Sequence, residues 1–142
     1  MAHANFQVAT KALFIKDGKI LTLTTPNNYV DFPGGRLDDT EYELPFKEGL
    51  RRELSEELGN DISYKINDFA FASKRDYIHL GQHHIVALFF NVTYITGEFQ
   101  LSDEHEKLEW LTPKQLIARK DRFQSGTEFD ELSAYLTKIN LL

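Results

Sequence analysis

The segment GGRLDDTEYELPFKEGLRRELSEELGN, residues 34–60, joins a glycine pair to a run rich in leucine and glutamate. The leucine spacing predicts a helix over residues 48–58, because residues four apart lie on one helix face. The leucines of this stripe are Leu50, Leu54 and Leu58. Gly59 follows at once, and glycine favours the left-handed backbone that ends many helices. We expect the stripe to pack against a hydrophobic core.

Three glutamates lie on an adjoining face of this predicted helix. Glu53, Glu56 and Glu57 are spaced i, i+3 and i+4, which brings side chains together on a helix surface. Like charges at this spacing destabilise a helix, so the cluster needs a counter-charge. Arg52 can reach Glu56 one turn on, which allows a solvated, salt-bridged face as one interpretation. The other interpretation is a hard divalent cation, since Mg²⁺ binds carboxylate and carbonyl oxygens.

The glycine pair Gly34-Gly35 favours the cation interpretation. We expect a turn there, because glycine permits backbone paths closed to other residues and lets a metal or substrate approach the main chain. The Gly34 carbonyl is therefore a candidate metal ligand. Neither the glycine pair nor the glutamate cluster is specific alone, but together at this distance they predict a metal site.

Strand patterns flank this segment. Two β-rich runs on either side of Asp17-Gly18 predict a hairpin over residues 7–24, because this dipeptide suits a tight turn. ISYKINDFAFAS (62–73) and HHIVALFFNVTYI (83–95) read as further strands, and the second is apolar enough for the interior of a sheet. HEKLEWL (105–111) predicts a short last strand.

Two helices are expected after these strands. Thr112 and Gln115 form a T-x-x-Q capping box around Pro113, which predicts a helix over about 113–120. Residues 128–139 carry apolar side chains at helical spacing, so this last helix should pack on the sheet. Strands alternating with helices predict an α/β or α+β fold, with a mixed sheet flanked by helices.

The composition indicates one domain over residues 1–142, in a soluble and cytoplasmic protein. The chain has no cysteine, which excludes a thiolate nucleophile and a cysteine-based zinc site. No signal peptide or membrane span is recognisable, and a net charge of −6 argues against binding duplex nucleic acid. His79, His83 and His84 do not suggest a zinc site, because the neighbours His83 and His84 would face opposite sides of a strand.

The glycine and glutamate segment resembles the signature of MutT-like Nudix hydrolases, G-x5-E-x7-R-E-U-x-E-E-x-G-U, where U is a bulky aliphatic residue. The matching residues are Gly35, Glu41, Arg52, Glu53, Leu54, Glu56, Glu57 and Gly59. Ten residues separate Glu41 from Arg52 where the signature has seven, which indicates a three-residue insertion within YELPF (42–46). Alternatively, Glu43 takes the place of Glu41. Asn60 departs from the final aliphatic position.

The resemblance implies an α/β/α sandwich that hydrolyses a nucleoside diphosphate linked to another moiety, by water attack on phosphorus with Mg²⁺ or Mn²⁺. Glu53 would be the general base or a metal ligand. Glu56, Glu57 and the Gly34 carbonyl would bind metal, and Arg52 would orient Glu53. Some members recruit a base from a later loop, where Glu104 is our first candidate and Glu106 the second.

The expected substrate is a small nucleotide: a nucleoside triphosphate, a noncanonical nucleotide or a dinucleoside polyphosphate. Members that cleave dinucleoside polyphosphates resemble this chain in having a tyrosine at the distance of Tyr77. Phe32 is a candidate to stack on the base, and Arg36 a candidate to bind substrate. A non-catalytic nucleotide-binding or regulatory domain is the alternative, disfavoured because all three helix glutamates are present. Monomer and homodimer are equally open.

Overall fold

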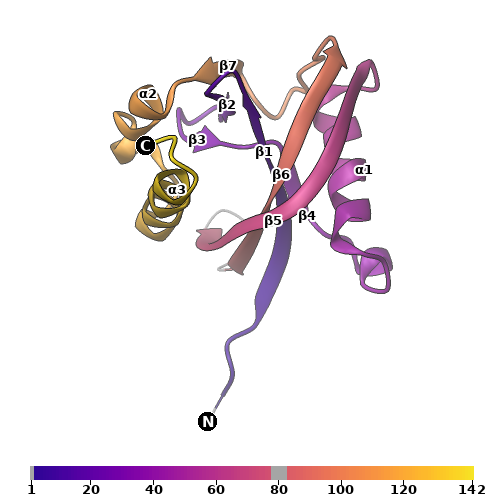
Figure 1. The fold of residues 1–142 in the computed structure, drawn as a ribbon. Helices are drawn as coiled ribbons and strands as arrows, with labels where there is room; N and C mark the ends of the chain where they lie inside the picture. Colours follow the sequence, from indigo (N-terminus) through magenta and orange to yellow (C-terminus); the bar gives the residue numbers. More distant parts are fainter. Residues whose placement is uncertain (1, 78–82) are drawn as a thin grey trace.

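A mixed β-sheet lies between α1 on one side and α2 and α3 on the other (Figure 1). The computed structural model describes residues 2–77 and 83–142. Its strands are β1 (Phe6–Lys16), β2 (Lys19–Thr24), β3 (Val30–Asp31), β4 (Gly34–Arg36), β5 (Ile62–Tyr77), β6 (His83–Gly97) and β7 (Lys107–Leu111). Its α-helices are α1 (Phe46–Leu58), α2 (Pro113–Ile117) and α3 (Gly126–Lys138). Short 3-10 helices cover Asp39–Glu41 and Lys120–Arg122. The predicted fold class is confirmed.

The sheet places the first hairpin beside a strand from the second half of the chain. The strand order is β3-β2-β1-β6-β5, with β4 paired to β1 and β7 paired to β2. The predicted hairpin is present, and its turn residues Asp17 and Gly18 have φ of 53° and 74°. The strand β6 runs parallel to β1 and lies between β1 and β5, so its predicted interior position is confirmed.

Alternating residues of β1 and β6 build a core on each face of the sheet. On one face the three leucines of α1 pack, fully buried, against side chains that include Phe14 and Phe90. On the other face Phe89 packs with residues of α2 and α3, among them Leu116 and Leu132. The leucine stripe thus fixes α1, and with it the glutamate face, against the sheet.

The expected turn at Gly34-Gly35 is instead the strand β4, antiparallel to β1. A Cβ at Gly34, whose φ is +132°, would overlap the Thr10 carbonyl oxygen, so only glycine permits this close pairing. The capping box at Thr112 and Gln115 is present, but α2 ends at Ile117, earlier than expected. Among the described residues, no helix has the length and apolar character to span a membrane.

Candidate active site

An open cleft of about 1720 Å³ runs along the face where β4, α1 and the loop before β7 meet. Its lining includes every helix glutamate of the predicted metal site, together with Gly34, Gly35, Arg36, Arg52 and Glu104. The cleft therefore brings together residues far apart in the sequence, such as Gly34 and Glu104, which are 70 positions apart.

Glu53 lies directly over Gly35. A Cβ built on Gly35 would stand 2.5 Å from Glu53 Oε2, so the absent side chain leaves the space that the carboxylate fills. Arg52 Nη1 lies 3.0 Å from Glu53 Oε1. Burial raises the pKa of Glu53, while the charge of Arg52 opposes the shift. Glu53 is thus a mostly buried, fixed carboxylate at the cleft wall.

Arg52 is itself held by Glu41. Its Nε and Nη2 donate to the two carboxylate oxygens of Glu41 at 3.0 and 2.8 Å, and Nη2 also donates to the Arg36 carbonyl at 3.1 Å. These hydrogen bonds lower the pKa of Glu41. Glu43 instead accepts from the Tyr42 hydroxyl at 3.0 Å, so Glu41 is the partner of Arg52. The insertion within residues 42–46 stays a prediction.

Glu57 is buried beside β4. Its Oε1 accepts a hydrogen bond from the Gly34 amide at 2.7 Å. Burial raises the pKa of Glu57 to about 7, against the opposing effects of Lys11 and the Gly34 amide. The Gly34 carbonyl accepts from Lys11 Nζ at 3.2 Å. Glu56 lies at the exposed rim, where Arg52 Nη1 donates to it at 3.2 Å.

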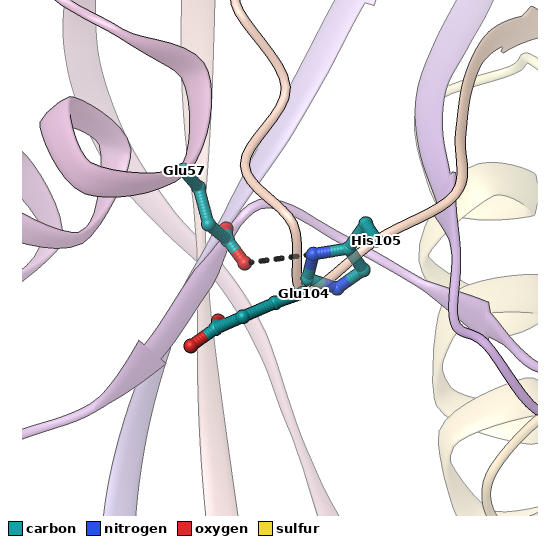
Figure 2. Close-up of side chains that lie close together, drawn as sticks. All are labelled: Glu57, Glu104 and His105. Carbon is teal, nitrogen blue, oxygen red and sulfur yellow. Dashed lines mark ion pairs between the residues drawn. The ribbon is translucent and has the colours of Figure 1, made fainter.

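The sequence did not reveal His105, which lies next to Glu57. His105 Nδ1 is 3.3 Å from Glu57 Oε2, and Nε2 is 3.0 Å from Asp31 Oδ2. Figure 2 shows Glu57 reaching from α1 toward the His105 ring, with the exposed Glu104 extending beside them. Burial disfavours charge on His105, but the hydrogen bond with Asp31 and the charges of Asp31 and Glu57 outweigh it and raise the pKa of His105.

A buried set of charges lies beneath these groups. Asp31 Oδ1 lies 3.2 Å from Lys11 Nζ and 3.1 Å from Arg75 Nη1. Arg75 also donates through Nε and Nη2 to both carboxylate oxygens of Glu128 on α3, each at 2.8 Å. Burial would raise the pKa of Asp31, but Lys11, Arg75 and His105 hold it well below the usual range. A lysine inside the apolar run of β1 was the one sequence signal for this network.

The predicted substrate residues lie in different environments. Phe32 is wrong as a stacking residue, because its side chain is 0% exposed and packs on Phe89 with ring centroids 5.3 Å apart. Arg36 lines the cleft and donates to Gln7 Oε1 at 2.8 Å. The side chain of Tyr77 and the whole of His79 lie outside the described part of the chain.

The oxygen ligands available at the cleft fit a hard divalent cation. Carboxylates of α1 and the Gly34 carbonyl supply oxygen ligands, which Mg²⁺ and Mn²⁺ prefer. The space over Gly35, filled by the Glu53 carboxylate, keeps one of these oxygens against the main chain.

Comparisons with known proteins identify the family of the chain. The chain matches the family model described as NUDIX domain over residues 5–131. Curated protein sequences gave no match.

Many solved structures share the fold. A MutT protein from Methanosarcina mazei has 20% identity and a TM-score of 0.76, with 98% of this chain and 99% of that chain covered. A possible asymmetric diadenosine tetraphosphate hydrolase from Jonesia denitrificans has 18% identity and a TM-score of 0.75, with 97% of each chain covered. An ADP-ribose pyrophosphatase from Streptococcus suis has 16% identity and a TM-score of 0.66, with 96% and 92% covered.

Sequence identities this low establish only a shared fold. The family model establishes the family, because it matches most of the sequence. The prediction of a Nudix hydrolase domain is confirmed, and the chain belongs to the Nudix family.

Proposed function

We propose that the protein is a divalent-metal-dependent pyrophosphohydrolase, which splits a nucleoside diphosphate linked to another moiety by water attack on phosphorus. The observation that carries this proposal is the placement of Glu53 on Gly35 by the Arg52–Glu41 pair, beside a second carboxylate, Glu57, on the Gly34 amide. A cation with substrate phosphates would add counter-charge for the buried Glu57 and for the mostly buried Glu53, which Arg52 already pairs.

We assign a role to each residue of the site. Glu57, Glu56 and the Gly34 carbonyl would hold the cation, since they supply oxygen at the cleft. When bound, a divalent cation neutralises phosphate charge and lowers the pKa of the attacking water. Glu53 would accept the proton of that water, or bind metal, and Glu104 is the alternative base. Arg52 is a positioning residue, because it joins Glu53 to Glu41 rather than facing open solvent.

The cleft supports a substrate with two parts. Its volume of about 1720 Å³ exceeds the 300–1000 Å³ or so typical of pockets for one drug-sized ligand. The neighbours described as a diadenosine tetraphosphate hydrolase and an ADP-ribose pyrophosphatase act on such two-part nucleotides by their names. We propose nucleoside triphosphates, noncanonical nucleotides and dinucleoside polyphosphates as the substrate classes, with a small nucleotide rather than duplex nucleic acid as the partner.

A panel of these nucleotides, incubated with Mg²⁺, Mn²⁺ or EDTA, tests the proposal. We expect turnover that needs the metal and falls by about 10² or more in Glu53→Gln, the scale typical of losing a general base. Glu48→Gln is the matched control, because Glu48 lies on the same helix but is half-exposed and pairs with Arg51 at 3.5 Å. Nucleotide binding without any turnover would refute the proposal and favour a binding domain.

A further inference from the structure

His105 presents a buried ring nitrogen to the carboxylates of the cleft. Its side chain is only 6% exposed, and Nδ1 has no hydrogen-bond partner of acceptable geometry among the residues that the structure describes. Glu57 Oε2 lies 3.3 Å from this nitrogen. A buried polar atom without a partner costs free energy, so this nitrogen requires an explanation.

The partners of Asp31 decide which ring nitrogen carries the proton. Asp31 already accepts hydrogen bonds from Lys11, Arg75 and the Phe32 amide, so it acts as an acceptor throughout. The 3.0 Å contact with His105 therefore needs a donor at Nε2. In the neutral imidazole this leaves a lone pair on Nδ1, directed toward Glu57.

A lone pair and a carboxylate oxygen 3.3 Å apart repel each other unless a proton or a metal cation lies between them. Metal ligands lie about 2.0–2.2 Å from the ion, so two neighbouring ligands at angles of about 90–110° are about 2.8 to 3.6 Å apart. The observed separation falls in that range. Ligand atoms of Glu57, Glu104 and His105 all lie within 4.8 Å of one another (Figure 2).

The hydrogen bond to Asp31 matches a recurrent arrangement of metal-binding histidines. Such histidines usually donate their other ring N–H to a carboxylate, which fixes the tautomer and the ring orientation. The loop is fixed as well, because the Ser102 amide donates to the Glu57 carbonyl at 2.9 Å and the Glu106 amide donates to the Thr24 carbonyl at 2.9 Å. Backbone hydrogen bonds on both sides of His105 therefore fix the position of its ring.

We propose that His105 is a ligand of the divalent cation through Nδ1, beside Glu57 and Glu104, and that this nitrogen makes the site prefer a later transition metal ion such as Co²⁺ over Mg²⁺. This inference rests on the proposed function for the location of the cation. Imidazole nitrogen binds transition metal ions well, whereas Mg²⁺ favours oxygen ligands and water.

Electron spin echo spectroscopy of Mn²⁺ bound to the untagged protein tests the ligand directly. We expect a coupling to ¹⁴N that changes to the ¹⁵N pattern in protein grown with ¹⁵N-histidine. The coupling disappears in His105→Asn and persists in His84→Asn, a matched control whose exposed ring pairs with Asp76 at 2.7 Å. Absence of nitrogen coupling in the wild type, or its persistence in His105→Asn, would overturn the assignment, and the wild-type result does not depend on the folding of any variant.

Titration calorimetry tests the preference between ions. His105→Asn should weaken Co²⁺ binding about 10- to 100-fold, the range for disturbed metal sites, and Mg²⁺ binding by much less. An equal loss for both ions would refute the preference, because it indicates a general disturbance of the site. Nucleotide turnover is measured separately: turnover without nitrogen coupling contradicts this inference alone, and coupling without turnover contradicts the proposed function alone.

Discussion

Replacing the buried Glu57 by glutamine should stabilise the metal-free protein at neutral and alkaline pH. Folding raises the pKa of Glu57 from 4.5 to about 7, mainly through burial. Between pH 4.5 and about pH 7 the Glu57 carboxyl is ionised in the unfolded chain but protonated in the folded protein. The free energy of unfolding therefore falls as the pH rises. The full difference corresponds to about 3 kcal/mol, reached above pH 7.

Glutamine has the shape of glutamate and no charge, so Glu57→Gln should not show this loss. The side chain can still accept from the Gly34 amide, as Glu57 does at 2.7 Å. We expect the stability of Glu57→Gln relative to wild type to increase by about 3 kcal/mol from pH 4.5 to pH 8 in EDTA. Saturating Mn²⁺, at about 100 times its dissociation constant, should stabilise the wild type by about 2.7 kcal/mol and the variant much less.

Urea unfolding followed by the fluorescence of Trp110, the one tryptophan of the chain, measures these differences. Glu48→Gln serves as the control, because a substitution at a half-exposed glutamate usually changes stability by less than about 0.5 kcal/mol. A Glu57→Gln curve parallel to wild type over this pH range would refute the reasoning, since it would mean that the buried carboxylate carries no cost when ionised.

Three further substitutions test the neighbours of the site. Gly35→Ala places a methyl group 2.5 Å from Glu53 Oε2 and should reduce kcat about 10²-fold by displacing the carboxylate, as steady-state kinetics would show. Arg52→Lys cannot reproduce the two-pronged contact and should lower kcat about 10- to 100-fold in the same assay. Arg75→Met leaves the fully buried Glu128 unpaired and should lower the free energy of unfolding by about 3–5 kcal/mol, measured in urea.

Each of these has a result that would contradict it. Full activity in Gly35→Ala would show that the position of Glu53 is unimportant for turnover. Wild-type kcat in Arg52→Lys would mean that a single positive charge positions Glu53 as well as the two hydrogen bonds from the guanidinium to Glu41 do. An Arg75→Met variant within about 1 kcal/mol of wild type would show that Glu128 is neutral or hydrated in the folded protein.

The helix and the hairpin could be predicted because their signals are local. The leucine stripe and Gly59 fix the limits of α1 to within two residues, and Asp17-Gly18 fixes the first turn. Short strands were harder to predict. The strand β4 has three residues and no side-chain pattern, and it forms only because β1 supplies its hydrogen-bond partners.

The site could be predicted in part, where its residues share one element. The i, i+3 and i+4 spacing placed Glu53, Glu56 and Glu57 together, and all three line the cleft. His105 and Asp31 meet them through tertiary contacts between segments 74 residues apart, which no spacing reveals.

Phe32 shows why neighbours in sequence can be misassigned. Asp31 and Phe32 are adjacent, but successive side chains of an extended chain point to opposite sides. Asp31 faces the charged network at the cleft, and Phe32 enters the core between the sheet and the C-terminal elements. The sequence gives no sign of which residue takes which side, because the short strand β3 lacks an alternating pattern.

Hydrolysis in ¹⁸O-labelled water is the most direct test of the central claim. With a nucleotide that the protein turns over, ³¹P NMR and mass spectrometry identify where the water oxygen enters. We predict one ¹⁸O atom per turnover in a phosphate group of one product, only when Mg²⁺ or Mn²⁺ is present. The rate of this incorporation should be lower by about 10²-fold or more in Glu53→Gln. Label in a carbon-bound oxygen, or equal turnover in EDTA, would contradict a metal-dependent attack of water on phosphorus.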